Sequence, residues 1–317
     1  MNKDIRNTDK IHIAISTDAN YLEHAAATIA SIFCNMAVDD YCVVYVLRTK
    51  DLDCTCLHGL EDIKSGQCEI KYVDIDLSLF ATFPEINYFT VAAYFRLALH
   101  LLLPDVPKLL YLDIDLLVRC SLRDLWNTDL TGFLAGVVES PSLEKFGSKK
   151  FYNLPAMHKS IGLKSGTCFN SGVMLMNLEL LRAENIWVEY MEAFEEFGDR
   201  IQAADQDILN HVFSNRVKYV GFKWNVGLHG YLCWPLYDTY DDVEVIAGCQ
   251  SPGIAHFFGP RKPWTREHVR HPFSLEYWAY RKKAGMTGLA WRHLYKKHTQ
   301  WLRPCKQKSI YKMMEQQ

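Results

Sequence analysis

Residues 108–118 read Lys-Leu-Leu-Tyr-Leu-Asp-Ile-Asp-Leu-Leu-Val, an apolar run that two carboxylates interrupt. The first five residues predict a buried strand, and Asp113, Ile114 and Asp115 follow at its carboxyl end. Side chains two residues apart share one face of an extended segment, so these carboxylates repel each other unless a cation joins them. Oxygen ligands suit Mg²⁺ or Mn²⁺, and Mg²⁺ commonly joins protein carboxylates to nucleotide phosphates. We therefore predict a divalent-metal site here, rather than a surface loop with incidental acids.

Strand and helix patterns alternate along the sequence around this stretch. The β-α-β-α-β order predicts an α/β fold with a mainly parallel sheet and helices on its faces. Such sheets bind ligands at the carboxyl ends of their strands, where Asp113 and Asp115 lie. The predicted strands are residues 11–16, 42–47, 70–75, 108–112, 133–138, 169–177, 217–219 and 254–258. The predicted helices are residues 21–36, a charged segment through Asp62 and Lys64, 90–103, 179–197 and 205–213, and residues 140–166 are a predicted loop.

The composition is that of an ordinary globular protein, with 317 residues, 49% of them hydrophobic and 23% charged. It excludes disordered, collagenous and coiled-coil chains. The longest stretch without charge, residues 245–260, is shorter than the roughly 20 apolar residues that span a bilayer. Residues 1–10 are polar, and no apolar signal core follows a basic start. We therefore expect a cytoplasmic protein whose ten scattered cysteines are free thiols.

The net charge of −2 hides an uneven distribution. Residues 261–317 carry 14 Lys+Arg against 3 Asp+Glu, whereas residues 1–260 carry 21 against 34. Such a basic tail favours an anionic partner: phospholipid, nucleic acid or a phosphorylated substrate. Because no nucleic-acid recognition motif accompanies the charge, we expect no nucleic-acid partner.

The end of the chain, residues 266–317, mixes basic and aromatic residues in a pattern that predicts helices. This mixture favours attachment to an anionic membrane surface, at the inner face of the cell membrane. The alternative is that the aromatic side chains pack on the rest of the protein and only the cations face solvent. We therefore divide the chain into a main domain, residues 1–265, and a basic helical extension. The residues concerned are Tyr277, Trp278, Tyr280, Trp291, Tyr295 and Trp301, with Arg281, Lys282, Lys283, Arg292, Lys296 and Lys297.

A second informative segment, residues 254–264, runs from an apolar strand into Gly-Pro-Arg-Lys-Pro-Trp. His256 lies in that strand and is a candidate nitrogen ligand for the same metal. A lone histidine on an apolar strand is more often a core residue, but its neighbours here favour a ligand role. Gly259 permits close approach of the backbone to a ligand, and Lys262 can pair with a phosphate.

Two further segments place polar groups beside apolar elements. Asp205, Gln206 and Asp207 precede an apolar helix, where one of the acids is expected to cap the helix and the other groups to face a site. Asn170 and Ser171 lie just inside a predicted strand, where the alternative is a turn at a sheet edge.

Six segments of this sequence, taken together, resemble the family 8 retaining glycosyltransferases. That family includes bacterial lipopolysaccharide glucosyl- and galactosyltransferases and glycogenin, and the lipooligosaccharide α-galactosyltransferases are similar in ending with a basic, aromatic tail. The resemblance spans roughly residues 11–265. It implies a GT-A, Rossmann-like fold with a mixed, mainly parallel sheet, a UDP-sugar donor and Mn²⁺. The segments are residues 16–21, 94–96, 111–118, 169–177, 205–210 and 256–264.

The resemblance also implies roles for residues at matching positions. Asp113, Asp115 and His256 match the protein ligands of Mn²⁺, for which Mg²⁺ is the alternative. Gln206 matches the residue nearest the reacting face, with Asp205 beside it. Ser16, Asp18 and Asn20 match positions that hold the uracil and ribose of UDP, and Tyr21 matches a residue that stacks nearby. The Ile114 backbone matches a position that faces the ribose. Gly259 and Lys262 match groups around the diphosphate. The positions around the donor sugar are Arg96, Asn170, Ser171, Asp205 and Gln206.

These roles imply an enzyme that moves galactose or glucose from a UDP-sugar to a glycan acceptor, of the lipopolysaccharide type or another cell-surface glycan. The configuration at the anomeric carbon is retained either through double displacement by a protein nucleophile or through attack of the acceptor on the same face as the leaving group. Gln206 is a poor nucleophile and Asp205 is the alternative one, so same-face attack is favoured. Glu139 falls where an acceptor-contacting acid occurs, and residues 140–166 cover the acceptor in this family. Other hypotheses are a UDP-sugar hydrolase, a glycogenin-like enzyme that glucosylates its own tyrosine, and a nucleotide-sugar sensor.

Overall fold

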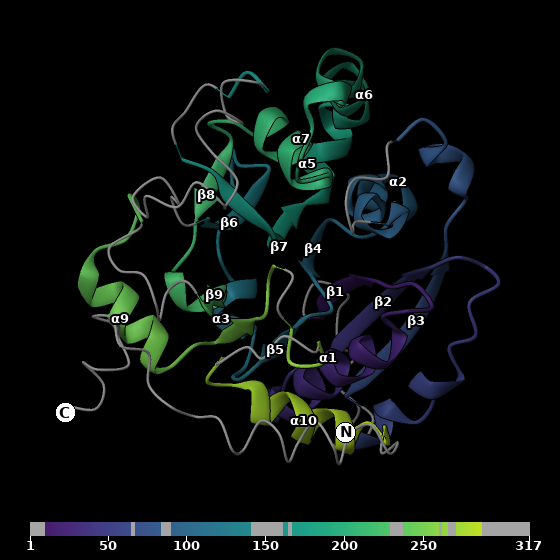
Figure 1. Cartoon of the computed structure of the whole chain (residues 1–317), viewed down its shortest axis with the longest axis vertical. Helices are drawn as coiled ribbons and strands as arrows, with labels where there is room; N and C mark the ends of the chain where they lie inside the picture. The colour runs from purple at the N-terminus through teal and green to yellow at the C-terminus, as the bar shows by residue number, and fades with distance from the viewer. Residues whose placement is uncertain are drawn as a thin grey trace.

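A seven-stranded sheet with the strand order β3-β2-β1-β4-β7-β6-β8 lies at the centre of the computed structural model (Figure 1). The structure describes residues 10–64, 67–83, 90–140, 161–163, 167–228, 237–259, 262–265 and 271–286. The strands of this sheet are β1 (Ile11–Ser16), β2 (Cys42–Arg48), β3 (Cys68–Asp74), β4 (Lys108–Leu112), β6 (Ala135–Glu139), β7 (Phe169–Asn177) and β8 (Val217–Tyr219). A second, three-stranded sheet contains β5 (Leu116–Val118), β10 (Ile254–His256) and β9 (Val226–Gly227).

The central sheet is mixed and mainly parallel, which confirms the expected fold class. Strands β3, β2, β1 and β4 run parallel to one another, β7 is antiparallel to both β4 and β6, and β8 is parallel to β6. Every residue of β1 is buried, as expected for a parallel strand covered on both faces. Ile13 and Ile15 pack into one hydrophobic cluster and Ala14 into the other, because successive side chains point to opposite faces.

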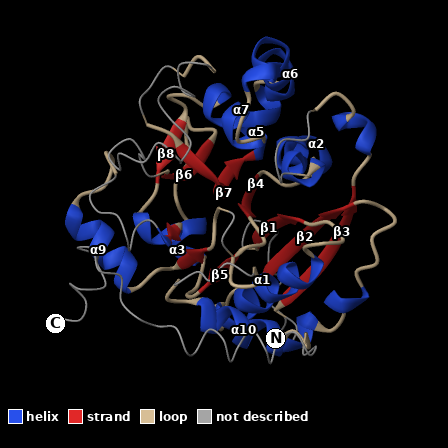
Figure 2. Cartoon of the chain, in the orientation of Figure 1, coloured by secondary structure: helices blue, strands red, loops and turns tan. Residues whose placement is uncertain are grey.

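Helices cover both faces of the sheet (Figure 2). The first cluster packs α1 against the sheet, and the second packs η5, α2, α5, α6 and α7. The α-helices are α1 (Leu22–Asn35), α2 (Leu99–Leu102), α3 (Arg123–Trp126), α5 (Leu178–Ala183), α6 (Ile186–Phe197), α7 (Asp205–Val212), α9 (Asp242–Gln250) and α10 (Ser274–Lys283). The 3₁₀ helices are η2 (Thr55–Leu57), η3 (Leu60–Lys64), η4 (Leu77–Phe80), η5 (Val91–Ala98), η7 (Gly198–Arg200) and η8 (Phe222–Trp224).

Two predicted helices differ from the structure. The single helix expected over residues 179–197 is divided between α5 and α6, because Asn185 adopts a left-handed backbone with φ 50°. The helix expected over residues 90–103 is mostly the 3₁₀ helix η5, whose backbone hydrogen bonds span three residues instead of four. Strands β5 and β9 and helices α3 and α9 were not predicted. Most of the loop expected at residues 140–166 lies outside the described residues.

Helix α10, the described part of the basic extension, packs beside α1 (Figure 1). Tyr277 and Trp278 are 1% and 2% exposed, so the expectation that they contact a bilayer is wrong for these two residues. Ion pairs hold the helix in place: Arg119 binds Glu276 through two nitrogens, and Arg281 binds Glu23. The aromatic and basic residues expected at positions 291–301 lie outside the described residues.

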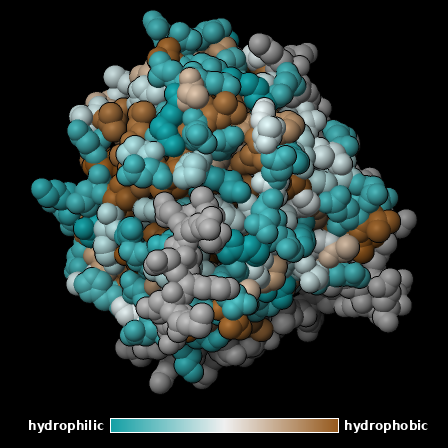
Figure 3. Space-filling view, turned by 180° about the vertical axis from the view of Figure 1, so that it is seen from behind, coloured by the Kyte–Doolittle hydropathy of each residue, from teal (hydrophilic) through white to brown (hydrophobic). Residues whose placement is uncertain are grey.

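One face of the molecule is seen in Figure 3. Hydrophilic residues cover most of this face, and hydrophobic residues form several small patches among them. Among the described residues, no helix combines the length and hydropathy needed to cross a membrane. None of the eight described cysteines is in a disulfide bond, and Cys233 and Cys305 lie outside the described residues.

Candidate active site

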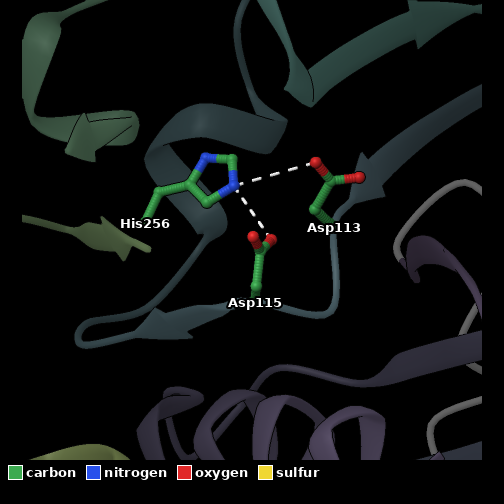
Figure 4. Close-up of side chains that lie close together, drawn as sticks. All are labelled: Asp113, Asp115 and His256. Carbon is green, nitrogen blue, oxygen red and sulfur yellow. Dashed lines mark hydrogen bonds and ion pairs between the residues drawn. The ribbon is translucent and has the colours of Figure 1, made fainter. Parts of the chain in front are cut away.

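Three side chains from two elements converge at the carboxyl end of β4. Asp113 and Asp115 lie in the turn between β4 and β5, rather than within one continuous strand. Strand β10 pairs antiparallel with β5, and this register places His256 opposite Leu116. The His256 Nε2 atom lies 3.0 Å from Asp115 Oδ1 and 3.7 Å from Asp113 Oδ2 (Figure 4).

This cluster fits a divalent metal ion. One ligand atom from each of Asp113, Asp115 and His256 lies within 4.8 Å of the others. Two carboxylate oxygens and one imidazole nitrogen form a donor set that suits a first-row divalent ion or Mg²⁺. Gly172 on β7 leaves room for the cluster, since a Cβ there would lie 2.3 Å from His256 Cε1 and 2.5 Å from Asp113 Oδ2.

Lys262 adds a positive charge to the same cluster. Its Nζ atom forms an ion pair with Asp115, which is 9% exposed. Burial alone would raise the pKa of the Asp115 carboxyl, but the neighbouring charges of Lys262 and His256 outweigh burial and hold that pKa far below its usual range. Asp115 is therefore ionised at neutral pH, as a metal ligand must be.

Arg96 on η5 joins the metal cluster to α7. Its guanidinium group is 5% exposed, donates from Nη2 to Asp113 Oδ1 at 2.8 Å, and lies 3.1 Å from Asp205 Oδ2 through Nε. It also donates to the Ser171 carbonyl oxygen at 2.7 Å and lies over the Tyr111 ring. Burial raises the pKa of Asp205 to about 6 although Arg96 opposes that shift.

A pocket of about 300 Å³ opens beside these residues. Asp18 holds the loop after β1 in place, since its carboxylate accepts hydrogen bonds from the backbone N–H groups of Asn20 and Tyr21 and from the Thr90 hydroxyl. Gly259 has a φ of +86°, a left-handed conformation that favours glycine. The pocket is lined by Ser16, Thr17, Asp18, Tyr21, Thr90, Ala92, Ala93, Arg96, Tyr111, Asp113, Ile114, Asp115, Gly259, Lys262 and Thr265.

Most of the predicted site residues are therefore brought together by the fold. Asn20 is exposed and does not line the pocket. Gln206 borders the site from α7, where its Oε1 atom accepts hydrogen bonds from Asn170 Nδ2 and the Ser171 backbone. Five predicted site residues do not line the pocket themselves but contact the lining residues, or one another, through side chains. These five are Asn170, Ser171, Asp205, Gln206 and His256.

Glu139 has a different environment from the one expected by resemblance. The side chain is 3% exposed, and its two oxygens accept hydrogen bonds from the backbone N–H groups of Asp238 and Thr239 at 2.8 and 2.7 Å. Glu139 therefore fixes the segment that follows residues 229–236, which lie outside the described residues.

Sequence reasoning missed Thr90, Gly172 and Asn225. Asn225 is 4% exposed and its Oδ1 atom lies 2.8 Å from His256 Nδ1. Its only sequence signal is a single amide in the run Phe-Lys-Trp-Asn-Val-Gly at residues 222–227. Its contact with His256 bridges 31 residues of chain, so local pattern did not reveal it.

A mixed sheet with a candidate metal cluster and a pocket at the carboxyl end of β4 is the arrangement expected of a GT-A glycosyltransferase. The profile of the family described as Glycosyl transferase family 8 matches residues 12–268, and this chain belongs to that family. The result confirms the expected family and fold.

Individual relatives agree with this assignment. The chain is 26% identical to a putative glycosyltransferase of Haemophilus influenzae, over 81% of this chain and 74% of that protein. It is 29% identical to the lipopolysaccharide 1,3-galactosyltransferase of Salmonella typhimurium, again over 81% of this chain and 74% of that protein. The structure of galactosyltransferase LgtC in complex with donor and acceptor sugar analogs superposes with a TM-score of 0.72 and 27% identity, covering 90% of this chain and all of LgtC.

Proposed function

We propose that this glycosyltransferase moves a hexose, galactose or glucose, from a UDP-sugar to a glycan acceptor with retention, and that it depends on Mn²⁺ or Mg²⁺. The observation that carries the proposal is the convergence of Asp113, Asp115, His256 and Lys262 at one pocket. Two carboxylates and an imidazole suit a divalent cation, and the adjacent ammonium suits a diphosphate.

The residues divide the chemistry between the leaving group and the sugar. A divalent ion bound by Asp113, Asp115 and His256 supplies Lewis-acid stabilisation of the charge on the leaving diphosphate. The Lys262 ammonium, which pairs with Asp115 in this structure, is placed to stabilise the same developing charge. Gly259 allows the backbone to approach the diphosphate closely.

Same-face attack is the route to retention that these contacts favour. Asp205 is 2% exposed and pairs with the Arg96 guanidinium, so its carboxylate is a poor candidate for a nucleophile. Gln206 is an amide and a weak nucleophile. We therefore assign the proton of the acceptor hydroxyl to the leaving phosphate oxygen and no covalent intermediate to the protein.

The relatives suggest the kind of acceptor. The Salmonella relative is a lipopolysaccharide 1,3-galactosyltransferase, and LgtC is a galactosyltransferase that binds donor and acceptor sugar analogs. By this similarity we propose a lipopolysaccharide-type or other cell-surface glycan as the acceptor.

A thermal-shift panel tests the donor site. UDP, UDP-glucose, UDP-galactose, UDP-N-acetylglucosamine and GDP-mannose are each added with and without Mn²⁺, because a ligand of the folded state raises the apparent stability. We expect stabilisation by one UDP-hexose that requires Mn²⁺ in the wild type and is lost in Asp115→Asn. No shift with any UDP compound would refute the proposed donor.

A further inference from the structure

A chain of side-chain amides connects the metal cluster to Gln206. His256 Nδ1 lies 2.8 Å from Asn225 Oδ1, Asn225 Nδ2 donates to Asn170 Oδ1 at 2.8 Å, and Asn170 Nδ2 donates to Gln206 Oε1 at 3.0 Å. His256 and Asn225 are 1% and 4% exposed, so water competes little for these contacts. The four residues come from β10, the segment after η8, β7 and α7.

Backbone N–H groups fix the direction of every hydrogen bond in this chain. The Gly172 N–H donates to Asn170 Oδ1 at 3.1 Å, and the Ser171 N–H donates to Gln206 Oε1 at 3.3 Å. A backbone N–H can only donate, so both side-chain atoms must be oxygens. Asn225 therefore presents its NH₂ group to Asn170, and its own oxygen faces His256.

The orientation of Asn225 determines which ring nitrogen of His256 carries a proton. Because an amide oxygen only accepts, Nδ1 must be the donor. The other ring nitrogen, Nε2, faces Asp113 and Asp115 and hydrogen-bonds Asp115 Oδ1 in this structure, so it is the nitrogen that would give up its proton to bind a metal ion at the cluster. A hydrogen bond to the second ring nitrogen is a general means of orienting a metal-binding histidine.

At the other end of the chain, α7 is fixed to β7. Asn210, one turn after Gln206, accepts from the Phe169 N–H at 2.8 Å and donates to the Phe169 carbonyl at 2.9 Å. Gln206 Oε1 already has two donors, so the Nε2 amide group is its remaining polar group for a ligand.

We propose that Asn225 is a positioning residue that orients His256 for the metal and, through Asn170, orients the Gln206 amide. The part that concerns Gln206 rests on the proposed function, whereas the part that concerns His256 requires only that the cluster binds a metal. A single buried amide thus links the two ends of the site.

Two substitutions at Asn225 separate the two contacts. Asn225→Ala removes both. Asn225→Asp keeps an acceptor for the His256 Nδ1–H but removes the donor to Asn170. The control is Asn177→Ala, which removes a partly buried asparagine whose side chain caps α5 away from the cluster.

The main measurement is Mn²⁺ affinity, from free Mn²⁺ detected by electron paramagnetic resonance, with and without UDP. We expect Asn225→Ala to weaken Mn²⁺ binding about 10- to 100-fold, and Asn225→Asp to stay within about threefold of the wild type. Transferase turnover is expected to fall at least about tenfold in both variants. Asn177→Ala is expected to retain wild-type affinity and turnover, and thermal unfolding checks that each variant is folded.

The outcomes distinguish this proposal from the proposed function. Wild-type Mn²⁺ affinity in Asn225→Ala would overturn the role of Asn225 at His256. Equal weakening of Mn²⁺ binding in Asn225→Asp and Asn225→Ala would overturn it too, because that result would indicate that Asn225 acts through packing alone. Wild-type turnover in Asn225→Asp would overturn the role at Gln206. Failure of the wild type to turn over any UDP-sugar would refute the proposed function instead, and the Mn²⁺ measurement would still test Asn225.

Discussion

Gly172 is the residue whose replacement should report most directly on the metal cluster. The smallest added side chain would meet His256 and Asp113 at distances that real Cβ atoms do not show. We expect Gly172→Ala to displace these ligands and to weaken Mn²⁺ binding by at least about tenfold. Gly198→Ala is the control, because nothing lies within 4 Å of a Cβ at that position. Equal Mn²⁺ affinity in Gly172→Ala and the wild type would contradict this prediction, because it would show that His256 and Asp113 can shift without weakening metal binding.

Gln206 allows a second prediction at the level of single residues. Its oxygen accepts from Asn170 and Ser171, so we expect the amide nitrogen to be the group that acts on substrate. Gln206→Glu keeps an acceptor oxygen for Asn170 and Ser171 but replaces the amide donor with a second oxygen. Turnover should fall about 10²- to 10³-fold, the typical effect of removing one stabilising donor. Turnover equal to or above that of the wild type would instead indicate that the oxygen is the reacting group.

The three residues of the candidate metal cluster could be picked out from sequence, whereas the residues that contact and orient them could not. Asp113 and Asp115 interrupt an apolar run, and buried charges must be paired with other groups or bind a cation, so this conflict between charge and burial indicates a candidate site. Asn225 and Gly172 produce no such conflict. An asparagine and a glycine are common in loops and strands, and their roles here exist only because β10, β7 and the segment after η8 meet in space.

At the scale of elements, an aromatic cluster joins three segments beside the pocket. His24 on α1 stacks on Trp264 with ring centroids 3.9 Å apart, and Trp264 lies 4.9 Å from the Tyr277 ring on α10. His24 Nδ1 also contacts the Tyr277 hydroxyl. Trp264 follows Lys262 by two residues, so this cluster holds the segment that carries the ammonium group.

Trp264→Leu should therefore affect donor binding more than the chemical step. Stacked aromatic pairs contribute about 0.5–1.5 kcal/mol beyond their buried area, which corresponds to a rise of up to about tenfold in KM for the donor. We expect a smaller change in kcat. Trp187→Leu is the control, because Trp187 stacks on Phe83 and is not among the residues that line the pocket. A KM unchanged in Trp264→Leu, or raised equally in both variants, would contradict this role.

Elements with continuous patterns were predictable, and elements defined by their neighbours were not. Strand β1 is apolar throughout because both of its faces are covered, and its predicted bounds are those observed. Strand β5 is only three residues long and extends the same apolar run as β4, so periodicity could not separate them. The division between α5 and α6 depends on the backbone of one residue, Asn185, which the hydrophobic pattern does not record.

At the scale of the whole molecule, α10 shows why charge and composition do not determine where a segment lies. The aromatic and basic pattern favoured attachment to a membrane surface, with packing of the aromatic side chains on the rest of the protein as the alternative. The described helix instead buries Tyr277 and Trp278, and its cations partly pair with acids of other elements, as Arg281 does with Glu23. The helix carries both aromatic and charged side chains. The aromatic side chains can be buried while the charged groups stay at the surface. The same composition is thus consistent with a structural helix of the enzyme.

The pH dependence of global stability is expected to reflect a buried histidine. His100 on α2 is 1% exposed, and burial, with a smaller contribution from the nearby Arg182 charge, lowers its pKa to about 4. The unfolded chain has a histidine pKa near 6.5, so between these values the unfolded state binds a proton that the folded state does not. Stability is therefore fully present above pH 6.5 and decreases as the pH falls toward 4.

The contribution of His100 to this decrease is about 3 kcal/mol, from a pKa difference of roughly 2.5 units. We expect His100→Phe to reduce the fall in the free energy of unfolding between pH 6.5 and 4.5, measured by urea denaturation, because an apolar ring at this position binds no proton in either state. Part of the fall remains, since burial also lowers the pKa of His24 to about 4 and that of His271 to about 3. The exposed His58→Phe is the control for the substitution itself. If His100→Phe loses as much stability on acidification as the wild type, the acid sensitivity originates in other groups, and His100 gains access to water or an acceptor before the molecule unfolds.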